Sequence, residues 1–232
     1  MSSAASSVSE IAGVVFDMDG VLLDSEPYIL KAGQRMLKER YELDIPDEAF
    51  TPYVGRGEDA YLGGPAREHG VELNLPDDKN YTYELYLNAI KGELSAFKGV
   101  ATFIDKMESS GRPMAIFSAA DRMKVEGNLI EIGIDPSRFK IILTGSEVAK
   151  KKPDPEGYVR AVKELHLPPG KVLVIEDAVS GIKAGRAAGC PCLGITSTLS
   201  SEDLLEAGAS WTAPHLRDLP KGLELLLKED QR

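Results

Sequence analysis

The chain contains few cysteines. Its 232 residues include two, Cys190 and Cys192, with one residue between them. Two cysteines are too few for a disulfide framework, and their spacing differs from the two-residue gap of zinc-binding and redox pairs. Reduced thiols are typical of proteins in reducing compartments, so we expect both cysteines to be reduced and half-buried on a strand, in an intracellular protein.

Long apolar runs and an excess of basic residues are also missing. No apolar stretch approaches the roughly 18 residues that a membrane span requires. The chain has 37 acidic residues against 27 basic ones, which gives a formal net charge of −10. Such a surface repels the phosphates of nucleic acids and of anionic lipids. We therefore expect no nucleic acid and no membrane as a partner.

The first ten residues are rich in Ser and Ala, and they lack both the apolar centre of a secretory signal and any Arg. We interpret residues 1–10 as a disordered lead-in, and whether they are the remnant of a trimmed targeting segment stays open. The hydrophobic content of 43% and charged content of 28% are ordinary for a globular protein. We expect a cytoplasmic location, or a plastid one if a transit peptide has been removed.

An apolar run at residues 11–16 ends abruptly at the sequence Asp17-Met18-Asp19-Gly20. Such a run before a glycine is typical of a short buried strand in a parallel sheet. Two carboxylates two positions apart leave the strand end on the same side, and this end is where open α/β sheets bind ligands. Because neighbouring acids repel each other, we expect a cation beside them, and Mg²⁺ with phosphate as a companion ligand fits best.

This acidic pair has two other interpretations. An EF-hand calcium loop would need a further ligand at Val21 and a Glu at Tyr28, and it would follow a helix rather than a strand. A surface turn is a common place for Asp and Gly. The apolar run that leads straight into the pair favours a ligand site at a strand end.

Residues 25–96 show the apolar spacing of helices. Asp24 or Ser25 is a suitable cap for the first helix, with Pro27 in its first turn. Helical patterns cover residues 25–40, follow Pro46, cover residues 58–69 with a break at Gly63-Gly64-Pro65, and cover residues 77–91. We predict an all-helical cap domain at residues 25–96, inserted into a core domain of residues 11–24 and 97–232.

From Gly99 onward the pattern alternates between helix and strand. Strands are expected at residues 114–117, 140–144, 172–175 and 192–196. Helices are expected at residues 100–110, 123–132, 154–166, 178–188, 201–207 and 216–228. This alternation predicts a doubly wound, Rossmann-like α/β core with a parallel sheet.

Polar residues follow several of these strands. Each alone has an ordinary explanation as a turn residue, a helix cap or part of a solvated lysine run. Together they supply what phosphoryl transfer needs, namely a nucleophile, an acid/base, a hydroxyl, a cation and metal-binding carboxylates. They are Asp17, Asp19, Ser118, Lys152, Glu176 and Asp177.

With these residues in this order, the chain resembles the haloacid dehalogenase (HAD) superfamily phosphatases that carry a helical cap after the first strand. The four superfamily motifs correspond to Asp17-Met18-Asp19-Gly20, Ser118, Lys152-Pro153 and Glu176-Asp177, and the likeness extends over essentially the whole chain. Residues 17–27 and 176–189 are similar to β-phosphoglucomutase, to CbbY-type sugar-bisphosphate phosphatases, and to related sugar-phosphate and phosphoglycolate phosphatases. Residues 54–66 and 118–122 also resemble the HAD-like domain of plant suppressor-of-quenching proteins.

The resemblance implies catalytic roles for the motif residues. Asp17 would be the nucleophile that forms an aspartyl-phosphate. Asp19 would protonate the leaving oxygen and then activate water. Ser118, the backbone N–H of Ala119 and Lys152 would hold the oxygens of the transferring phosphoryl group.

The resemblance also implies a metal site and a substrate site. Mg²⁺ would be held by Asp17, by the backbone carbonyl of Asp19 and by Asp177, with Glu176 as a further ligand or as support for the ligands. The residues expected to contact substrate are Gly20, Ala119, Gly55, Arg56 and Glu58. For Arg56 an ordinary role as a surface cation stays open.

The chain departs from the mutase of this branch at three places that bear on the reaction. Ile29 stands where the mutase usually has a His, Gly57 replaces an Arg, and residues 120–122 replace Ser-Lys-Asn. These departures favour hydrolysis, so we predict a Mg²⁺-dependent phosphatase for a small phosphorylated metabolite such as a sugar phosphate, acting as a monomer. The alternatives are a β-phosphoglucomutase-like phosphomutase and a non-catalytic regulatory HAD-like domain.

Overall fold

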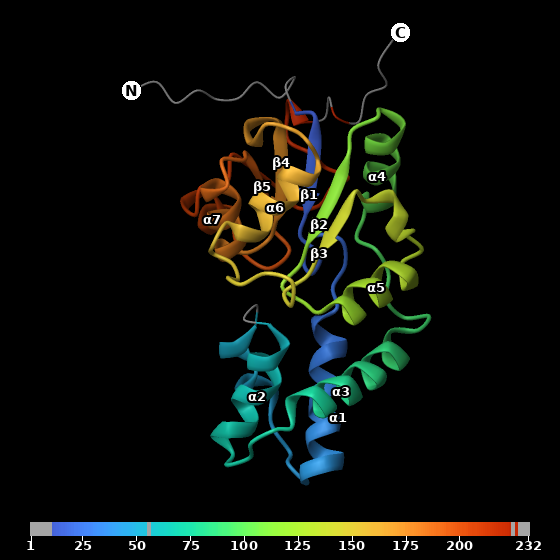
Figure 1. Ribbon diagram of the computed structural model, residues 1–232, viewed down its shortest axis with the longest axis vertical. Coiled ribbons are helices and arrows are strands. Elements are labelled where there is room, and N and C mark those ends of the chain that lie inside the picture. The colour runs from blue at the N-terminus through green and yellow to red at the C-terminus, as the bar shows by residue number, and fades with distance from the viewer. Residues whose placement is uncertain (1–10, 55–56, 224–225, 227–232) are drawn as a thin grey trace.

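The computed structural model describes residues 11–54, 57–223 and 226. In this part of the chain, six parallel strands form one sheet in the order β3-β2-β1-β4-β5-β6 (Figure 1). The chain builds outward from β1 to β3 and then returns to the other side of β1 with β4. Open α/β sheets bind ligands where the strand order reverses in this way. The strands are β1 (Gly13–Phe16), β2 (Met114–Phe117), β3 (Ile141–Leu143), β4 (Val172–Glu176), β5 (Cys192–Ile195) and β6 (Trp211–Ala213).

The central strand β1 is buried on both faces. Val14 and Phe16 belong to the apolar core on one face of the sheet, and Val15 belongs to the core on the other. This alternation follows the two-residue period of a strand. On the first face the ring of Phe16 packs edge-on against Phe103, with 5.8 Å between ring centroids. Burial on both faces explains why the run before Asp17 contains no polar residue.

Helices cover both faces of the sheet. Helices α4 and α5 contribute to the core on the Phe16 face, while α6, α7 and α8 contribute to the core on the Val15 face (Figure 1). This arrangement is the predicted doubly wound α/β fold. The helices of this region are α4 (Val100–Ser109), α5 (Arg122–Glu131), η4 (Pro136–Arg138), α6 (Glu156–Glu164), η5 (Pro169–Lys171), α7 (Val179–Ala187) and α8 (Ser201–Glu206).

The elements between β1 and α4 are all helical and lie together beyond the carboxyl ends of the strands (Figure 1). Ile29, Met36 and Leu37 of the first of these helices are fully or almost fully buried. The two chain connections to this region lie side by side, because the N–H of Phe97 donates to the carbonyl of Leu22 at 2.8 Å. The elements are α1 (Glu26–Tyr41), η2 (Asp47–Ala49), η3 (Thr51–Tyr53), α2 (Glu58–Glu68) and α3 (Leu75–Ile90).

Two expectations about helices were wrong. The pattern at residues 58–69 predicts a break at Gly63-Gly64-Pro65, but α2 runs through all three residues. Gly64 is needed for packing rather than for a break, since a Cβ atom there would lie 2.2 Å from the ring of Tyr53. Residues 216–222 form turns, a bend and irregular backbone instead of the start of the expected helix, and of residues 223–228 only 223 and 226 are described. Pro220 has no N–H to donate, and Gly222 has φ +103°, so neither continues a helix.

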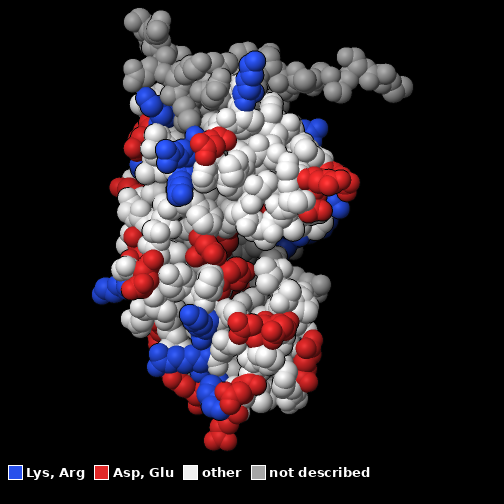
Figure 2. All heavy atoms as spheres, turned by 180° about the vertical axis from the view of Figure 1, so that it is seen from behind, with Lys and Arg blue, Asp and Glu red and all other residues white. Residues whose placement is uncertain are grey.

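The described residues include no helix that is both long and apolar enough to cross a membrane. On the face shown in Figure 2, Asp and Glu side chains border a hollow between the two halves of the molecule. The candidate site lies at the level of this hollow, between the carboxyl ends of the strands and the helices beyond them.

Candidate active site

The chain turns sharply where β1 ends. The N–H groups of Val21 and Leu22 both donate to the carbonyl of Met18, at 3.2 and 2.8 Å. Gly20 has φ +77°, and a Cβ atom there would lie 2.0 Å from Oδ2 of Asp177. Only a glycine allows the first loop and Asp177 to come this close. The turn leaves Asp17 at the end of the strand, beside residues that follow β2 and β4.

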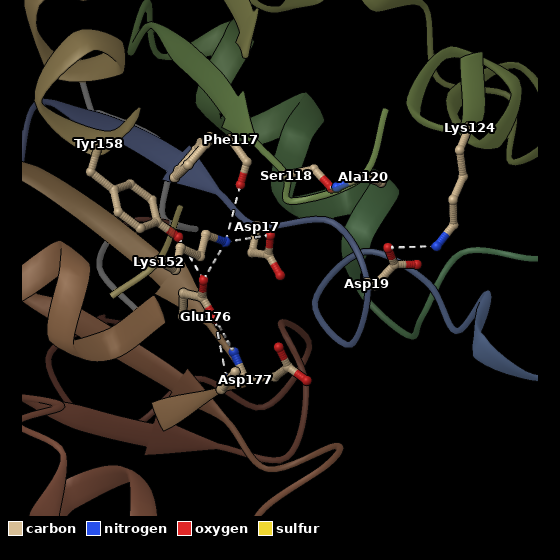
Figure 3. A network of polar contacts seen from close by, with 11 residues as sticks. Asp17, Asp19, Phe117, Ser118, Ala120, Lys124, Lys152, Tyr158, Glu176 and Asp177 are labelled. Carbon is tan, nitrogen blue, oxygen red and sulfur yellow. Dashed lines mark hydrogen bonds and ion pairs between the residues drawn. The ribbon is translucent and has the colours of Figure 1, made fainter. Parts of the chain in front are cut away.

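Asp17, Lys152 and Glu176 form a buried charged group at this edge (Figure 3). Nζ of Lys152 lies 2.7 Å from Oδ1 of Asp17 and 2.6 Å from Oε1 of Glu176. Burial opposes the charge of Lys152, but the attraction of the two carboxylates outweighs burial and raises the pKa of this lysine. Lys152 is therefore a fixed cation in contact with Asp17.

Glu176 is fully buried and satisfied by donors on both oxygens. Its Oε1 accepts from Lys152 and from the hydroxyl of Tyr158 at 2.7 Å, and its Oε2 accepts from the N–H groups of Asp177 and Ala178, both at 3.1 Å. A buried carboxylate with this many donors is held in one orientation. Glu176 therefore fixes Lys152 in front of Asp17.

Asp177 is held from the loop that follows β5. The hydroxyl of Thr198 donates to Oδ2 of Asp177, and the hydroxyl of Ser197 donates to the carbonyl of Gly20 at 2.5 Å. Burial, with the neighbouring charge of Glu176, raises the pKa of Asp177 to about 7, although the hydrogen bond from Thr198 opposes this rise. The loop after β5 thus braces both the Asp177 carboxylate and the first loop.

The acidic side chains at these strand ends fit a divalent cation. One carboxylate oxygen each from Asp17, Glu176 and Asp177 lie within 4.8 Å of one another. Burial raises the pKa of Asp17 well above its usual range, Glu176 and Asp177 add to the rise, and Lys152 opposes it. Hard cations such as Mg²⁺ prefer carboxylate oxygens and would offset this repulsion. Because both oxygens of Glu176 already accept hydrogen bonds, the arrangement favours Asp17 and Asp177 as ligands, with Glu176 as support.

Ser118 lies at the end of β2 and is buried. Its Oγ accepts from the N–H of Ala120 at 3.1 Å, and its own N–H donates to the carbonyl of Leu143 at 3.1 Å. Both Ser118 and Ala119 line the cavity that Asp17 and Lys152 also line. A hydroxyl next to a buried lysine can hold the oxygens of an anion.

Asp19 faces away from this group and toward the helices beyond the sheet (Figure 3). Its Oδ1 accepts from the hydroxyl of Ser25, and its Oδ2 lies 3.2 Å from Nζ of Lys124 on α5. Lys124 also lies 3.6 Å from Oε1 of Glu58 at the start of α2. Asp19 is therefore placed between the strand ends and α2.

A single cavity of about 630 Å³ joins these groups. It is large enough for a small metabolite. Its lining comes from the strand-end loops on one side and from the start of α1 and α2 on the other, including Ile29, Gly57, Glu58 and Tyr61.

The sequence matches the family model of the haloacid dehalogenase-like hydrolases over residues 14–195. The chain belongs to this family. Its relatives place it in the CbbY-like branch of phosphatases.

Three of the similar proteins carry different names. Protein SUPPRESSOR OF QUENCHING 1, chloroplastic, of Arabidopsis thaliana is 33% identical over 204 residues, which are 87% of this chain and 19% of that protein. Phosphorylated carbohydrates phosphatase of Thermotoga maritima is 29% identical over 206 residues, 84% of this chain and 91% of that protein. The structure of CbbY from Rhodobacter sphaeroides in complex with phosphate has the same fold, with a TM-score of 0.79 at 24% identity over 92% of this chain and 99% of that one.

The structure brings the residues of the four HAD motifs together, along with some that were not expected. Asp17, Asp19, Gly20, Ser118, Ala119, Lys152, Glu176, Asp177 and Glu58 all line the cavity. Gly55 and Arg56 lie outside the described residues. Sequence reasoning missed several residues that contact motif side chains, among them Ser25, Lys124, Tyr158 and Thr198. Lys124, Tyr158 and Thr198 lie away from the motifs in the chain, and only the fold places them beside the site.

Proposed function

We propose that this HAD-like hydrolase is a Mg²⁺-dependent phosphatase that hydrolyses a small phosphorylated metabolite, a sugar phosphate, through an aspartyl-phosphate on Asp17. The observation that carries the proposal is the contact of Asp17 with the buried Lys152, in one cavity with Ser118, Asp19 and Asp177. This set offers a nucleophile, a fixed cation and an acid/base beside a site for a divalent cation.

The reaction proceeds in two displacements. In the first, a carboxylate oxygen of Asp17 bonds to phosphorus while the ester oxygen leaves with a proton from Asp19. In the second, water attacks the phosphorus, its proton passes to Asp19, and phosphate leaves as Asp17 is released. Lys152, Ser118 and the N–H of Ala119 hold the phosphoryl oxygens and offset their charge in both steps.

The metal site of this proposal consists of Asp17, Asp177 and the backbone carbonyl of Asp19, supported by Glu176. Mg²⁺ bound there would neutralise the acidic group, so that a phosphate dianion could approach Asp17. We expect a chelator to remove activity, Mg²⁺ to restore it, and Ca²⁺ to inhibit, because Ca²⁺ takes a larger and looser set of ligands. Full activity in excess chelator would contradict this.

Hydrolysis is favoured over phosphomutase activity by side chains that differ from those of the mutase. Ile29, an apolar residue, lines the cavity where the mutase usually carries a His. Residues 120–122 also differ from the mutase: Asp121 is held in ion pairing with Lys79 at 2.8 Å, and Arg122 is paired with Glu147 at 2.7 Å. Transfer of phosphate to a sugar rather than to water, measured by product analysis, would reverse this choice.

We propose that residues 25–96 act as a cap domain over the core of residues 11–24 and 97–232. Glu58, buried and facing the cavity, is suited to accept a hydroxyl of the substrate. A small phosphorylated substrate is also what the named activity of the Thermotoga maritima relative suggests. A plastid location is a further proposal, prompted by the chloroplastic relative, and import of a fluorescent fusion would test it.

The test of this function uses two variants and two measurements. Asp17→Asn should abolish hydrolysis of an aryl phosphate, and Asp19→Asn should slow it by at least about 100-fold, the low end of general acid–base contributions. Intact-mass measurement after mixing with aryl phosphate should find a phosphoryl adduct on Asp19→Asn, since the second step needs the base, and none on Asp17→Asn. Near-native turnover by Asp17→Asn would exclude the aspartyl-phosphate, and a folded wild-type protein without turnover would favour the regulatory alternative.

A further inference from the structure

Lys124 is a buried lysine that belongs to none of the HAD motifs. It lies in the first turn of α5 and is 4% exposed. Its Nζ is directed toward Asp19 (Figure 3). It also lies above the ring of Tyr86, 5.8 Å from the centroid. Burying a charged amine is costly unless carboxylates compensate for it. We therefore expect carboxylates beside the amine of Lys124.

The partners of Lys124 come from two different parts of the molecule. Asp19, in the loop after β1, lies 3.2 Å away, and Glu58, at the start of α2, lies 3.6 Å away. Burial opposes the charge of Lys124, but Asp19 and Glu58 outweigh it and raise its pKa. The lysine thus stays charged while it connects the proposed acid/base to the helical region.

Asp19 is held at both oxygens in this arrangement. Ser25 donates to Oδ1 and Lys124 donates to Oδ2. Ser25 is the residue just before α1, and Lys124 lies in α5. Neither donor belongs to the buried charged group of Asp17, Lys152 and Glu176. An acid/base works only within hydrogen-bond reach of the oxygen it protonates, and a misplacement of about 1 Å can cost about 100-fold in rate.

We propose that Lys124 is the positioning residue for Asp19, and that by sharing Lys124 with Glu58 the protein couples the orientation of its acid/base to the position of α2. The inference rests on the proposed function of Asp19. When α2 moves toward the core or away from it, the distance between Glu58 and Lys124 changes. The hydrogen bond from Lys124 to Oδ2 of Asp19 changes as a result. The acid/base is then correctly aimed only when the cavity is correctly covered.

The experiment compares Lys124→Met with the wild type on a series of aryl phosphates, from nitrophenyl to phenyl phosphate. Loss of acid catalysis matters most for a poor leaving group, which needs a proton as it departs. We expect kcat/KM for phenyl phosphate to fall by about 10- to 100-fold, and kcat/KM for nitrophenyl phosphate to fall much less. The dependence of rate on leaving-group pKa should become steeper, as in Asp19→Asn.

Lys79→Met is the matched control. Lys79 on α3 also bridges to the region beyond β2, with ion pairs to Asp121 at 2.8 Å and to Asp59 at 2.6 Å, but it does not touch Asp19. If Lys124 only fastened the helices to the core, both variants would lose activity uniformly across the series. That result, or an equal steepening in Lys79→Met, would overturn the proposal.

A double-mutant cycle separates positioning from structure. In the Asp19→Asn background, Lys124→Met should have almost no further effect on kcat/KM, because its action passes through Asp19. Independent, additive losses would overturn the proposal. Circular dichroism checks folding, and Lys124→Gln, which keeps N–H donors without the charge, is the second variant. Failure of both Lys124 variants to fold would assign the residue a structural role only.

The proposed function itself can fail separately. A wild-type protein without turnover, or an Asp19→Asn variant with unchanged rates across the series, would contradict the role of Asp19. Wild-type turnover with the expected Asp19→Asn loss, but with no change in leaving-group dependence in Lys124→Met, would contradict the role of Lys124 alone.

Discussion

At the scale of single residues, Glu58 is a carboxylate whose ionised form is destabilised by burial. It is 8% exposed, and burial raises its pKa from 4.5 to about 6 even though Lys124 opposes the rise. The folded protein therefore binds a proton more readily than the unfolded chain between about pH 4.5 and 6. In this window the unfolding free energy falls as the pH rises, and above it the ionised side chain costs about 2 kcal/mol.

Glu58→Gln removes this cost and gives the first residue-scale prediction. We expect its unfolding free energy at pH 7.5 to exceed that of the wild type by about 1–2 kcal/mol, and the difference to vanish as the pH approaches 4.5. Urea denaturation at several pH values measures it. Glu84→Gln is the control, since Glu84 is an exposed residue of α3. A difference that does not depend on pH would show that the gain comes from another contact.

The residues predicted from the sequence share one property. Asp17, Glu176 and Asp177 directly follow or end buried strands, so the period of two and the run of apolar residues place them at one edge. Lys124 and Tyr158 lie within helices, and their side chains reach the site only through the packing of α5 and α6 on the sheet. No local pattern distinguishes a helical lysine that is buried from one that is solvated, so these residues could not be predicted.

At the scale of elements, the approach of α6 to the sheet depends on Gly157. Helix α6 carries Tyr158, whose ring packs edge-on against Phe117 of β2 at 5.1 Å between centroids. A Cβ atom at Gly157 would lie 2.2 Å from the ring of Phe117. Glycine inside a helix normally costs stability relative to alanine, so its presence here reflects the close contact with β2.

Gly157→Ala should therefore destabilise the protein although it improves helix propensity. The overlap of the added methyl group with Phe117 lowers the unfolding free energy by about 1–3 kcal/mol. The higher helix propensity of alanine raises it by about 1 kcal/mol. We expect the unfolding free energy to fall by up to about 2 kcal/mol in urea denaturation. Gly170→Ala is the control, because a Cβ atom there meets nothing within 4 Å. Stabilisation by Gly157→Ala would show that α6 can move away from the sheet without loss.

The elements were predictable where length and pattern agree. The strands from β1 to β5 and most helices lie within a few residues of their predicted positions, because each has its own apolar period. Strand β6 was missed because its three residues form no apolar run, and among the described strands β6 pairs with β5 alone, at the edge of the sheet. The break predicted within α2 was wrong because Gly63, Gly64 and Pro65 are typical of a helix end. In the structure they lie within the helix, where the glycines allow close packing.

At the scale of the whole molecule, the helices beyond the sheet are fastened to it unevenly. Near α5, Lys79 of α3 pairs with Asp121, and the hydroxyl of Tyr86 donates to Asn128. The two chain connections also pair with each other, through a bridge between Leu23 and Ala96. The start of α2 contacts α5 through the ion pair of Glu58 with Lys124 at 3.6 Å, and it also lines the cavity opposite the strand-end loops. This arrangement favours a hinge along the α3–α5 contact, with the start of α2 moving over the cavity as substrate binds.

Closure can be measured with a fluorescent pair that this chain offers. Its single tryptophan, Trp211, lies in β6, and both cysteines are buried, so a cysteine introduced at the exposed Glu72, between α2 and α3, can be labelled selectively. We expect energy transfer from Trp211 to a dye at Glu72→Cys to change when Mg²⁺ and vanadate are added together. Vanadate mimics the transferring phosphoryl group. The change should saturate in parallel with inhibition by vanadate.

The control for closure places the dye at Lys163→Cys, an exposed position of α6 on the same sheet domain as Trp211. Energy transfer there should not change, because closure leaves distances within the core intact. Mg²⁺ alone should produce little change at Glu72→Cys, since the proposed cation site is built from strand-end loops and includes no residue of α2. An unchanged signal at Glu72→Cys under inhibiting vanadate would mean that the helices hold one position throughout the reaction. The contact of Lys124 with Asp19 and Glu58 would then stay the same throughout the reaction. Substrate would have to enter the cavity without a movement of α2.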